Sequence, residues 1–559
     1  MATPAHRKSD PASPTGAPFP HRLWRWFDRT ILELGREMRL SFLPPLMVYA
    51  AAGISGLTSI VGTFFVKDYL SLSAEFLAAL AFWAGIPWAL KMPLGHLVDL
   101  IWRYKAGLVF LGAGMITGSL LIMLGLLADP DAMARVMPVE VWYVVSALLA
   151  PVGYVVQDVV ADAMTVEAVP RVDANGEAFD AATRRLMHTT MQTLGRVAII
   201  AGGVFVSLLN VLLFEDVETM PEAQKVATYI RIYEFALAIP VVSVLGVALG
   251  GLIKRRQLKR LRKSGVTAAR AEELAFGRIE KTEPNWWILG GGLVFVAFTI
   301  GMGLSEVGYN KEIIFAGSMA IVVFLMSRLI KVLEPEDRLV LVGTAVIIFI
   351  YRAMPTPGAG QTWWMIDELG FDQQFLAVLS LISSALTLFG MFIFRRFMAE
   401  RSIAYVIVFL TLASTLLYLP IVGMFYGLHQ WTAALTGGIV DAHFIALVDT
   451  ALESPLGQIA MIPMLAWIAN SAPQHLKATF FAVMASFTNL ALSASQLGTK
   501  YLNQIFTVTR EVRDRASGVV TVPADYGDLG WLMLTAMLLG FFLPIAAVVL
   551  IRVTRLKSA

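Results

Sequence analysis

The chain has 559 residues, of which 57% are hydrophobic and only 15% are charged, against about 25% charged residues in soluble domains. Its mean hydropathy is +0.69, and its apolar residues come in blocks of about 20, the length that crosses a ~30 Å hydrocarbon layer as a helix. The absence of cysteine excludes disulfides, thiolate metal sites and cysteine nucleophiles. These numbers predict an all-α polytopic protein embedded in the lipid bilayer.

The chain begins with a predicted cytoplasmic tail, residues 1–40. Its first 22 residues are rich in Pro, Ser and Ala and lack the apolar core of a cleaved signal peptide. The first membrane helix is therefore expected to direct insertion itself. In chain order, about fourteen transmembrane helices are predicted near residues 42–66, 75–98, 106–127, 140–168, 187–213, 229–253, 286–305, 312–333, 338–362, 373–394, 402–422, 441–468, 478–505 and 529–552.

Basic residues determine the predicted orientation, because they are enriched in cytoplasmic loops. The loop at 254–285 begins with KRRQLKRLRK, and Arg552 lies near the end of the chain. The connection at 214–225, on the other side, is mostly acidic. Both termini are therefore expected in the cytoplasm, with the protein in a bacterial inner (plasma) membrane. The basic run could instead bind anionic lipid or nucleic acid, but we interpret it as a topological signal, with no nucleic-acid partner.

Two stretches far apart in the chain are similar to each other. TFFVKDYLSLSAEFLAAL (63–80) and TWWMIDELGFDQQFLAVL (362–379) share seven of eighteen positions without a gap. The repeat predicts one six-helix half at 41–253 and a second at 334–552. Residues 286–333 are then an inserted two-helix hairpin, and residues 553–559 are a cytoplasmic C-terminus.

Parallel repeats of six helices are the plan of the major facilitator superfamily. The loop GHLVDLIWRYK (95–105) resembles that superfamily's GxLxDRxGRR loop, with Gly95, Asp99 and Arg103 at matching positions. The resemblance implies that these three residues form a gating loop, which holds helix ends together in one state of a transport cycle.

Three stretches of the first half resemble the folate–biopterin transporter family. They are IPWALKMPLGHLVD (86–99), QDVVADAMTVEA (157–168) and MQTLGRVAIIAGG (191–203). Members of that family show a Pro-Trp-x-x-Lys-Pro-like second helix, an Asp-x-x-x-Asp-x-x-x-Glu-like end to the fourth and a Gln followed by an Arg in the fifth. The resemblance implies a folate or pterin as solute. The QDxxxD element also recurs in muropeptide permeases and acetyl-CoA transporters, so those solute classes stay open.

The candidate site of the first half consists of Lys91, Gln157, Asp158, Asp162 and Arg196. At ~1.5 Å per helical residue, Asp158 and Arg196 lie roughly 15 Å, and Lys91 roughly 12 Å, from the cytoplasmic helix ends. A charge at the bilayer centre costs at least ~2.5–3.5 kcal/mol unless it is paired or hydrated, so Lys91 and Arg196 are expected to offset the carboxylates. Because neighbouring carboxylates repel when both are ionised, one of them can hold a proton. A structural ion-pair lock is the alternative.

The second half has its own charged residues, Arg352, Asp449 and Glu453. Glu453 lies roughly 20 Å from the outer side and Arg352 roughly 21 Å from the cytoplasmic side. Pro and Gly residues beside both are expected to interrupt their helices, and interrupted helices at mid-membrane depth are favoured positions for substrate sites. We predict a transport role for Glu453 and Arg352, with a purely structural ion pair as the alternative.

These observations favour a secondary active transporter that moves a small organic solute by alternating access, driven by protons or by the gradient of the solute itself. Nothing resembles a P-loop or a metal-ligand pattern, so no cofactor, no metal and no catalytic residue is expected, and the predicted state is a monomer. A membrane-embedded enzyme acting on lipid-linked substrates, and a receptor or scaffold that keeps a transporter fold, are the alternatives of other classes.

Overall fold

The computed structural model describes residues 38–70, 72–89, 91–101, 104–170, 179–217, 220–263, 265–268, 284, 286–303, 305, 307–331, 334–394, 397, 401–457, 459, 477–513, 520–554, 556 and 558. Eleven spans among these residues are long and apolar enough to cross a membrane. The predicted all-α membrane fold is confirmed, while the total of fourteen helices stays a prediction.

The first part of the chain folds into long helices that agree with the predicted spans to within a few residues, apart from earlier starts at residues 181 and 222 and a later end at residue 263, where the span was predicted to end at 253. Its elements are η2 (Leu40–Phe42), α3 (Leu43–Gly53), η3 (Ile54–Thr58), α4 (Ser59–Tyr69), α5 (Ala74–Ala89), α6 (Lys91–Leu100), α7 (Lys105–Ala128), α8 (Pro130–Ala134), α9 (Val139–Ala168), α10 (Ala181–Leu213), α11 (Glu222–Ala236) and α12 (Ala238–Lys263).

The rest of the chain is also helical except for one short hairpin. Its elements are α14 (Trp286–Gly303), α15 (Asn310–Ile330), α16 (Pro335–Arg352), α17 (Ala359–Asp367), α18 (Gln373–Ile393), α20 (Ile403–Phe425), α21 (Leu428–Thr436), α22 (Ala442–Glu453), η5 (Ser454–Leu456), α24 (Lys477–Ile505), β1 (Val512–Arg513), β2 (Val520–Val522) and α25 (Leu529–Val553). The strands β1 and β2 pair antiparallel, with Val512 opposite Val522, and the sequence analysis did not predict them.

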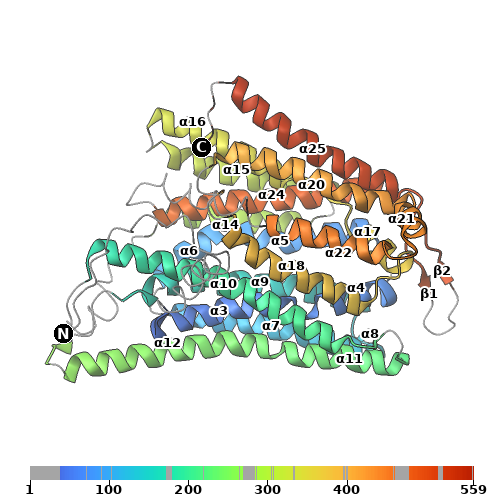
Figure 1. Ribbon diagram of the computed structural model, residues 1–559. Helices are drawn as coiled ribbons and strands as arrows, with labels where there is room; N and C mark the ends of the chain where they lie inside the picture. Colours follow the sequence, from blue (N-terminus) through green and yellow to red (C-terminus); the bar gives the residue numbers. More distant parts are fainter. Residues whose placement is uncertain are drawn as a thin grey trace, which may run out of the picture.

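The long helices run roughly side by side, with most helices before residue 264 below those after residue 334 in Figure 1. Two helix pairs join the parts: α5 packs on α24, and α10 packs on α18. When the inserted hairpin is left out of the count, α5 belongs to the second predicted helix and α24 to the eleventh. In the same way α10 belongs to the fifth and α18 to the eighth. Such reciprocal contacts are expected from a two-fold repeat. The domain boundaries themselves stay predictions.

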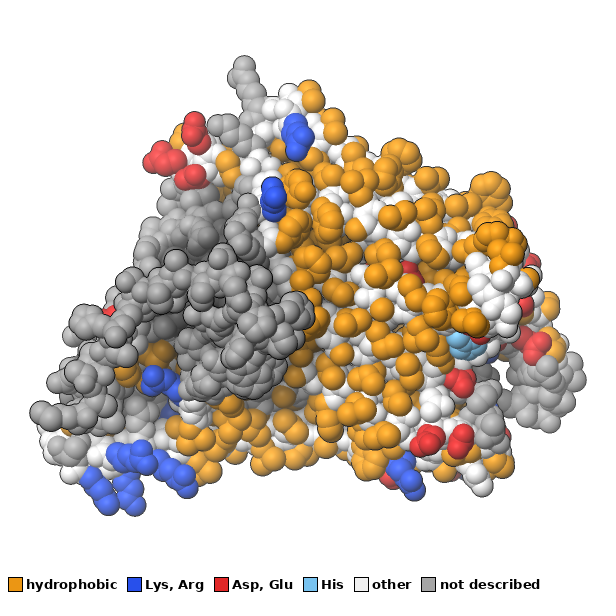
Figure 2. Space-filling view, viewed as in Figure 1, with side chains coloured by type: hydrophobic (Ala, Val, Ile, Leu, Met, Phe, Trp, Pro, Cys, Tyr) orange, Lys and Arg blue, Asp and Glu red, His pale blue; other side chains and the backbone are white. Residues whose placement is uncertain are grey.

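The bundle has two distinguishable ends. We call the end that bears β1 and β2 the hairpin end, and the end that bears residues 38–40 and 552–554 the terminal end (Figure 1). Hydrophobic side chains cover the middle of the face in Figure 2, and charged side chains mostly gather near the two ends. This is the distribution expected when a hydrocarbon layer surrounds the middle of a bundle, because charges there are costly.

Close helix packing in the first half depends on glycine. A Cβ on Gly112 of α7 would lie 2.6 Å from the Gly153 carbonyl oxygen of α9, and a Cβ on Gly153 would lie 2.7 Å from the Gly112 carbonyl oxygen. Lipid tails are as apolar as the side chains, so helices associate in membranes through such tight van der Waals contact. The two glycines therefore set the separation of α7 and α9.

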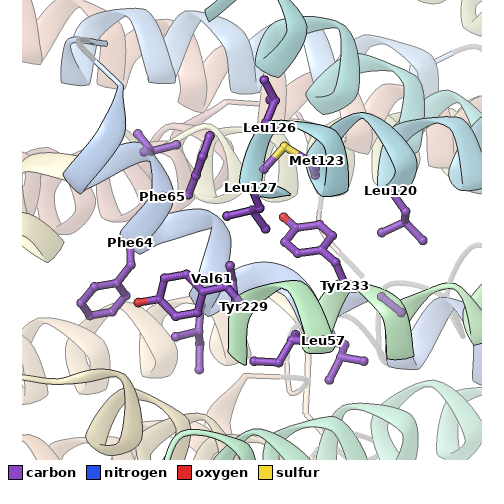
Figure 3. Close-up of a cluster of buried hydrophobic side chains, with 14 of the residues drawn as sticks. Leu57, Val61, Phe64, Phe65, Leu120, Met123, Leu126, Leu127, Tyr229 and Tyr233 are labelled. Atoms are coloured by element: carbon purple, nitrogen blue, oxygen red, sulfur yellow. The ribbon is translucent and has the colours of Figure 1, made fainter. Parts of the chain in front are cut away.

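At the hairpin end, the same half has a dense apolar core. Phe65 and Val61 of α4, Leu126 of α7 and Tyr229 of α11 are almost completely buried, and Figure 3 shows them gathered with their neighbours from these three helices. The cluster fixes α4 against α7 and α11, and therefore fixes one wall of the cavity described below.

The predicted span 338–362 is divided between two helices. α16 ends at Arg352 and α17 begins at Ala359, with Gly358 at a φ of 75°. A proline lacks the backbone N–H, so the PTPG stretch between them cannot continue the helix. Side chains of α24 bond its backbone: Ser495 donates to the Met354 carbonyl at 2.6 Å, and Asn503 to the Pro357 carbonyl at 3.1 Å. An irregular segment at membrane depth needs such partners.

α5 and α6 belong to one candidate membrane span, Ala74–Val98. Within it, Pro93 lacks a backbone N–H and cannot donate to the carbonyl four residues back, which is that of Ala89. The Lys91 ammonium group lies in the terminal half of the bundle, where it reaches α9.

Candidate functional site

Two helices, α6 and α9, bring one ammonium group and two carboxylates together, and α3 adds a hydroxyl group. Lys91 Nζ donates to Asp158 Oδ2 at 2.6 Å and lies 2.8 Å from Asp162 Oδ2. Tyr49 of α3 donates its hydroxyl to Asp162 Oδ1 at 2.6 Å. The side chains of Lys91 and Asp158 are 21% and 16% exposed, and that of Asp162 is 46% exposed. Lys91 therefore holds one buried and one accessible carboxylate.

The sequence spacing explains this arrangement. Asp158 and Asp162 are four residues apart on the continuous helix α9, which places both on one face, one turn apart. When all three groups are ionised, the cluster carries one more negative charge than positive. The Tyr49 hydroxyl partly offsets this excess by hydrogen bonding, and it was not among the residues predicted from the sequence.

Arg196 is exposed on α10 and interacts with Asp158 electrostatically at longer range. Its predicted part in the site stays a prediction. The cation in contact with both carboxylates is Lys91.

Gln157 is buried on a different face of α9 from Asp158. Its Nε2 donates to the Val109 carbonyl at 3.1 Å and to Ser243 Oγ at 3.0 Å. It thus ties α9 to α7 and α12, and its contacts are structural.

A second ion-pair group lies nearer the terminal end. Glu167, near the end of α9, contacts the buried Lys105 of α7 and lies 2.5 Å from Lys254 Nζ of α12. Of the predicted gating loop, Gly95 lies within α6, whereas Arg103 and the side chain of Asp99 lie outside the described residues. Among the residues that the structure describes, Lys105, the last residue of that loop motif, joins the start of α7 to the end of α9 through Glu167.

The charged residues of the second half gather around α22. Asp449 and Glu453 are four residues apart near its end, and the helix stops at Glu453, where Ser454–Leu456 form a 3-10 turn. Tyr418 of α20 interacts electrostatically with both carboxylates, and Tyr351 of α16 interacts with Glu453 and with Arg352. The structure thus brings all three predicted residues into one polar region.

A cavity of about 560 Å³ lies in the half of the bundle nearer the hairpin end. Its described lining contains no charged side chain and is rich in hydroxyl groups from η3, α4, α7, α9, α11 and α17, with the ring of Trp363 beside them. The hydroxyl-bearing residues are Ser55, Thr58, Ser59, Thr63, Ser119, Tyr143, Ser146, Tyr154, Tyr233 and Thr362.

The cavity adjoins both charged regions. Tyr154 lies one helical turn before Asp158 on α9. On α17, Gln361 precedes the lining residues Thr362 and Trp363 and accepts a 2.6 Å hydrogen bond from Tyr418. Sequence reasoning missed these hydroxyl groups, because single Ser, Thr and Tyr residues spread over several helices form no local motif.

Comparison with known proteins decides the family. The model of the BT1 family matches residues 52–558. The chain belongs to the BT1 family. Similar proteins include the folate-biopterin transporter of Synechocystis sp., 23% identical over 83% of this chain and 75% of that protein. Folate transporter 2 of Plasmodium falciparum is 27% identical over 31% of this chain and 36% of its own length. The predicted family resemblance is confirmed.

Solved structures show the fold of this BT1 family member. A mutant of the peptide transporter POT aligns with a TM-score of 0.53 at 14% identity, over 93% of this chain and 95% of that one. An auto-inhibited POT family peptide transporter also has a TM-score of 0.53, at 13% identity over 94% and 98% of the two chains. The chain therefore has the fold of major facilitator transporters, and its family makes it a membrane transporter and not an enzyme.

Proposed function

We propose that this BT1 family member moves a folate- or pterin-type solute across the membrane by alternating access, coupled to protons. The proposed solute class is based on the similarity to a folate-biopterin transporter, which extends over most of both chains. The two charged regions that adjoin the hydroxyl-lined cavity supply groups of both signs for the solute and the proton.

The Lys91 cluster supports proton coupling. One ammonium group contacts two carboxylates, and a proton on either carboxylate removes the excess negative charge. Asp158 lies one turn from cavity-lining Tyr154. Binding or loss of a proton here can therefore change how tightly α6 and α9 hold together while a solute occupies the cavity.

The second region supports recognition of a pterin. A pterin ring presents adjacent N–H donors on its 2-amino-pyrimidinone edge, and a carboxylate can accept both of them in a bidentate pair. Glu453 is exposed, and it lies one turn from Asp449 at the end of α22. In this proposal Glu453 binds the heterocycle, and Arg352 binds an acidic tail or a coupling carboxylate.

The same proposal assigns the terminal end to the cytoplasm. The basic residues Arg260, Arg262 and Lys263 complete α12 at that end, and Glu222 begins α11 at the opposite one. Because lysine and arginine are enriched on the cytoplasmic side, both termini are placed there, with the hairpin end outside.

Thermal unfolding of the purified protein in detergent tests the solute class. A ligand that binds the native state raises the melting temperature. We expect folate and biopterin to raise it, and a muropeptide and an acyl-CoA to leave it unchanged. A rise with the muropeptide or the acyl-CoA alone would replace the proposed solute with a solute of that class.

A further inference from the structure

The segment between α24 and α25 folds back over the hairpin end of the bundle. Thr509 and Asp525 bond each other through both backbone N–H groups, at 3.0 and 2.9 Å. This bridge closes a loop that carries β1 and β2, and the next residue, Arg510, extends its side chain into the protein. Arg510 is only 3% exposed.

Arg510 binds the end of α4, and one carbonyl just beyond it, in the other half of the chain. Its Nε donates to the Lys67 carbonyl at 2.6 Å, its Nη2 to the Val66 carbonyl at 2.7 Å and its Nη1 to the Leu72 carbonyl at 3.0 Å. The last carbonyls of a helix carry its negative dipole end. A carbonyl oxygen that already accepts one backbone hydrogen bond, as that of Val66 does from Leu70, has a second lone pair that can accept another. A buried guanidinium group is well suited to cap them.

The same guanidinium group also contacts α17. Its central carbon lies 4.8 Å from the centre of the Trp363 ring, within the range of a cation–π contact. One side chain thus holds α4 of the first half and α17 of the second half to the loop before α25.

A second contact joins the same three segments. Lys67 Nζ lies 2.6 Å from Asp367 Oδ1, which connects the last turn of α4 to the last residue of α17. The Tyr526 hydroxyl, at the far side of the loop, donates to the same carboxylate. Burial, together with this hydrogen bond, raises the pKa of Tyr526 well above its ordinary value, so its hydroxyl remains a donor at physiological pH.

The contacts lie on the wall of the cavity. Val66 and Trp363 both line it, and Arg510 binds both of them. A passage at this end requires α4 and α17 to separate. That separation would break the hydrogen bonds of Arg510 and the Lys67–Asp367 ion pair.

We propose that Arg510 is the clasp of a gate at the hairpin end: it must leave the carbonyls of α4 and the ring of Trp363 before the cavity can open there. The inference rests on the proposed alternating access, but it concerns a residue outside the solute and proton sites. Loss of the clasp should raise the population of the state that is open at this end.

The chain contains no cysteine, so single introduced cysteines report accessibility without background. Ser146→Cys places the reporter in the cavity, where Ser146 is 3% exposed. Thr436→Cys lies on α21 at an exposed position, so its labelling shows which membrane face carries the hairpin end. Ser318→Cys lies at a fully buried position in α15, so it is labelled only if the protein unfolds. A membrane-impermeant maleimide is added to the face that labels Thr436→Cys.

We expect Arg510→Ala to speed labelling of Ser146→Cys by about tenfold, while Ser318→Cys stays protected. Arg135→Ala is the matched control, because exposed Arg135 bonds only the Asp131 carbonyl one turn away, and it should leave the rate unchanged. Equal rates in the wild type and in Arg510→Ala, with Ser318→Cys protected, would overturn the proposal.

If Arg510→Ala unfolds the protein, Arg510→Lys decides the question. Lysine keeps the charge but lacks the planar fork of donors, so it should hold fewer of the three carbonyls and raise the labelling rate by about threefold. An unchanged rate in that folded variant would also overturn the clasp. Labelling requires no transported solute. Faster labelling of Ser146→Cys in the Arg510 variants, together with no folate uptake by the wild type, would therefore contradict the proposed solute and still support the clasp.

Discussion

Lys91 is the residue whose loss should matter most to the first charged region, because it contacts both carboxylates. Removing one partner of an ion pair leaves an uncompensated charge, which costs about 3–5 kcal/mol in a fully buried pair and less in this partly buried one. We expect Lys91→Gln to lower the melting temperature in detergent markedly. The double variant Lys91→Gln with Asp158→Asn should recover most of that loss.

Arg196→Gln is the matched control for this experiment. Arg196 is exposed and acts on Asp158 only at longer range, so its loss should lower the melting temperature much less. If Arg196→Gln is as destabilising as Lys91→Gln, or if the double variant gains no stability, the contact between Lys91 and Asp158 is not what holds these helices together.

Glu453 gives a separate prediction about recognition. In the proposed complex the pterin ring covers Glu453, and losing such a covered charged partner typically costs about 2–5 kcal/mol of binding free energy, so Glu453→Gln should weaken folate binding by more than about tenfold. Equilibrium binding to the detergent-stable variant measures this. Unchanged affinity with a lowered melting temperature would assign Glu453 a structural role and remove the recognition model.

Among the helices, the polar side of α24 stabilises the interruption between α16 and α17. Asn503 donates to the Pro357 carbonyl, and Thr499 Oγ1 accepts from the backbone N–H of Thr356 at 3.0 Å. A buried polar group left without its partner costs about 1–3 kcal/mol. We expect Asn503→Ala to lower the melting temperature clearly, and Leu492→Ala, at an exposed position on the same helix, to do so only slightly. Equal effects would contradict this role of α24.

The glycine contact between α7 and α9 gives a second prediction at this scale. A Cβ on Gly112 would lie 2.6 Å from the Gly153 carbonyl oxygen and 2.7 Å from Gln157 Cγ, whereas a Cβ on Gly114 has nothing within 4 Å. Gly112→Ala should therefore force the helices apart and destabilise the protein. Gly114→Ala should be neutral or stabilising, since alanine favours helix by about 1 kcal/mol over glycine. Similar melting temperatures for the two variants would contradict the packing account.

Helix positions could be predicted from the sequence because each span is bounded by local signals. Pro138 precedes α9, and the helix ends at Ala168, close to the predicted 140–168. The pairing of Lys91 with Asp158 could be predicted less directly from the sequence, because Lys91 and Arg196 were predicted at similar depths in the membrane. In the structure the Lys91 ammonium group, and not the Arg196 guanidinium group, contacts the carboxylates of α9.

Arg510 could not be found in this way. A lone arginine in a loop has no motif, and its partners are backbone carbonyls more than 430 residues earlier in the chain. Any residue can supply a carbonyl, so no pattern of side chains marks the site. The hydroxyl-lined cavity was missed for a similar reason, because its character comes from residues on several helices.

Across the whole molecule, the two ends and the middle of the bundle have different proposed roles. The Arg510 clasp holds the hairpin end, the Lys91 cluster lies toward the terminal end, and the cavity lies between them. In the proposed cycle the cavity opens at one end at a time, and protonation at Asp158 or Asp162 couples that change to the proton gradient.

Uptake of labelled folate into proteoliposomes tests the central claim most directly. With the solution outside the hairpin end made acidic, the wild type should accumulate folate, and it should stop doing so when a protonophore removes the gradient. Asp158→Asn, which is nearly isosteric, should lose gradient-driven accumulation while it remains folded. Wild-type accumulation by Asp158→Asn with the same pH dependence, or no folate uptake by folded wild-type protein, would contradict the account.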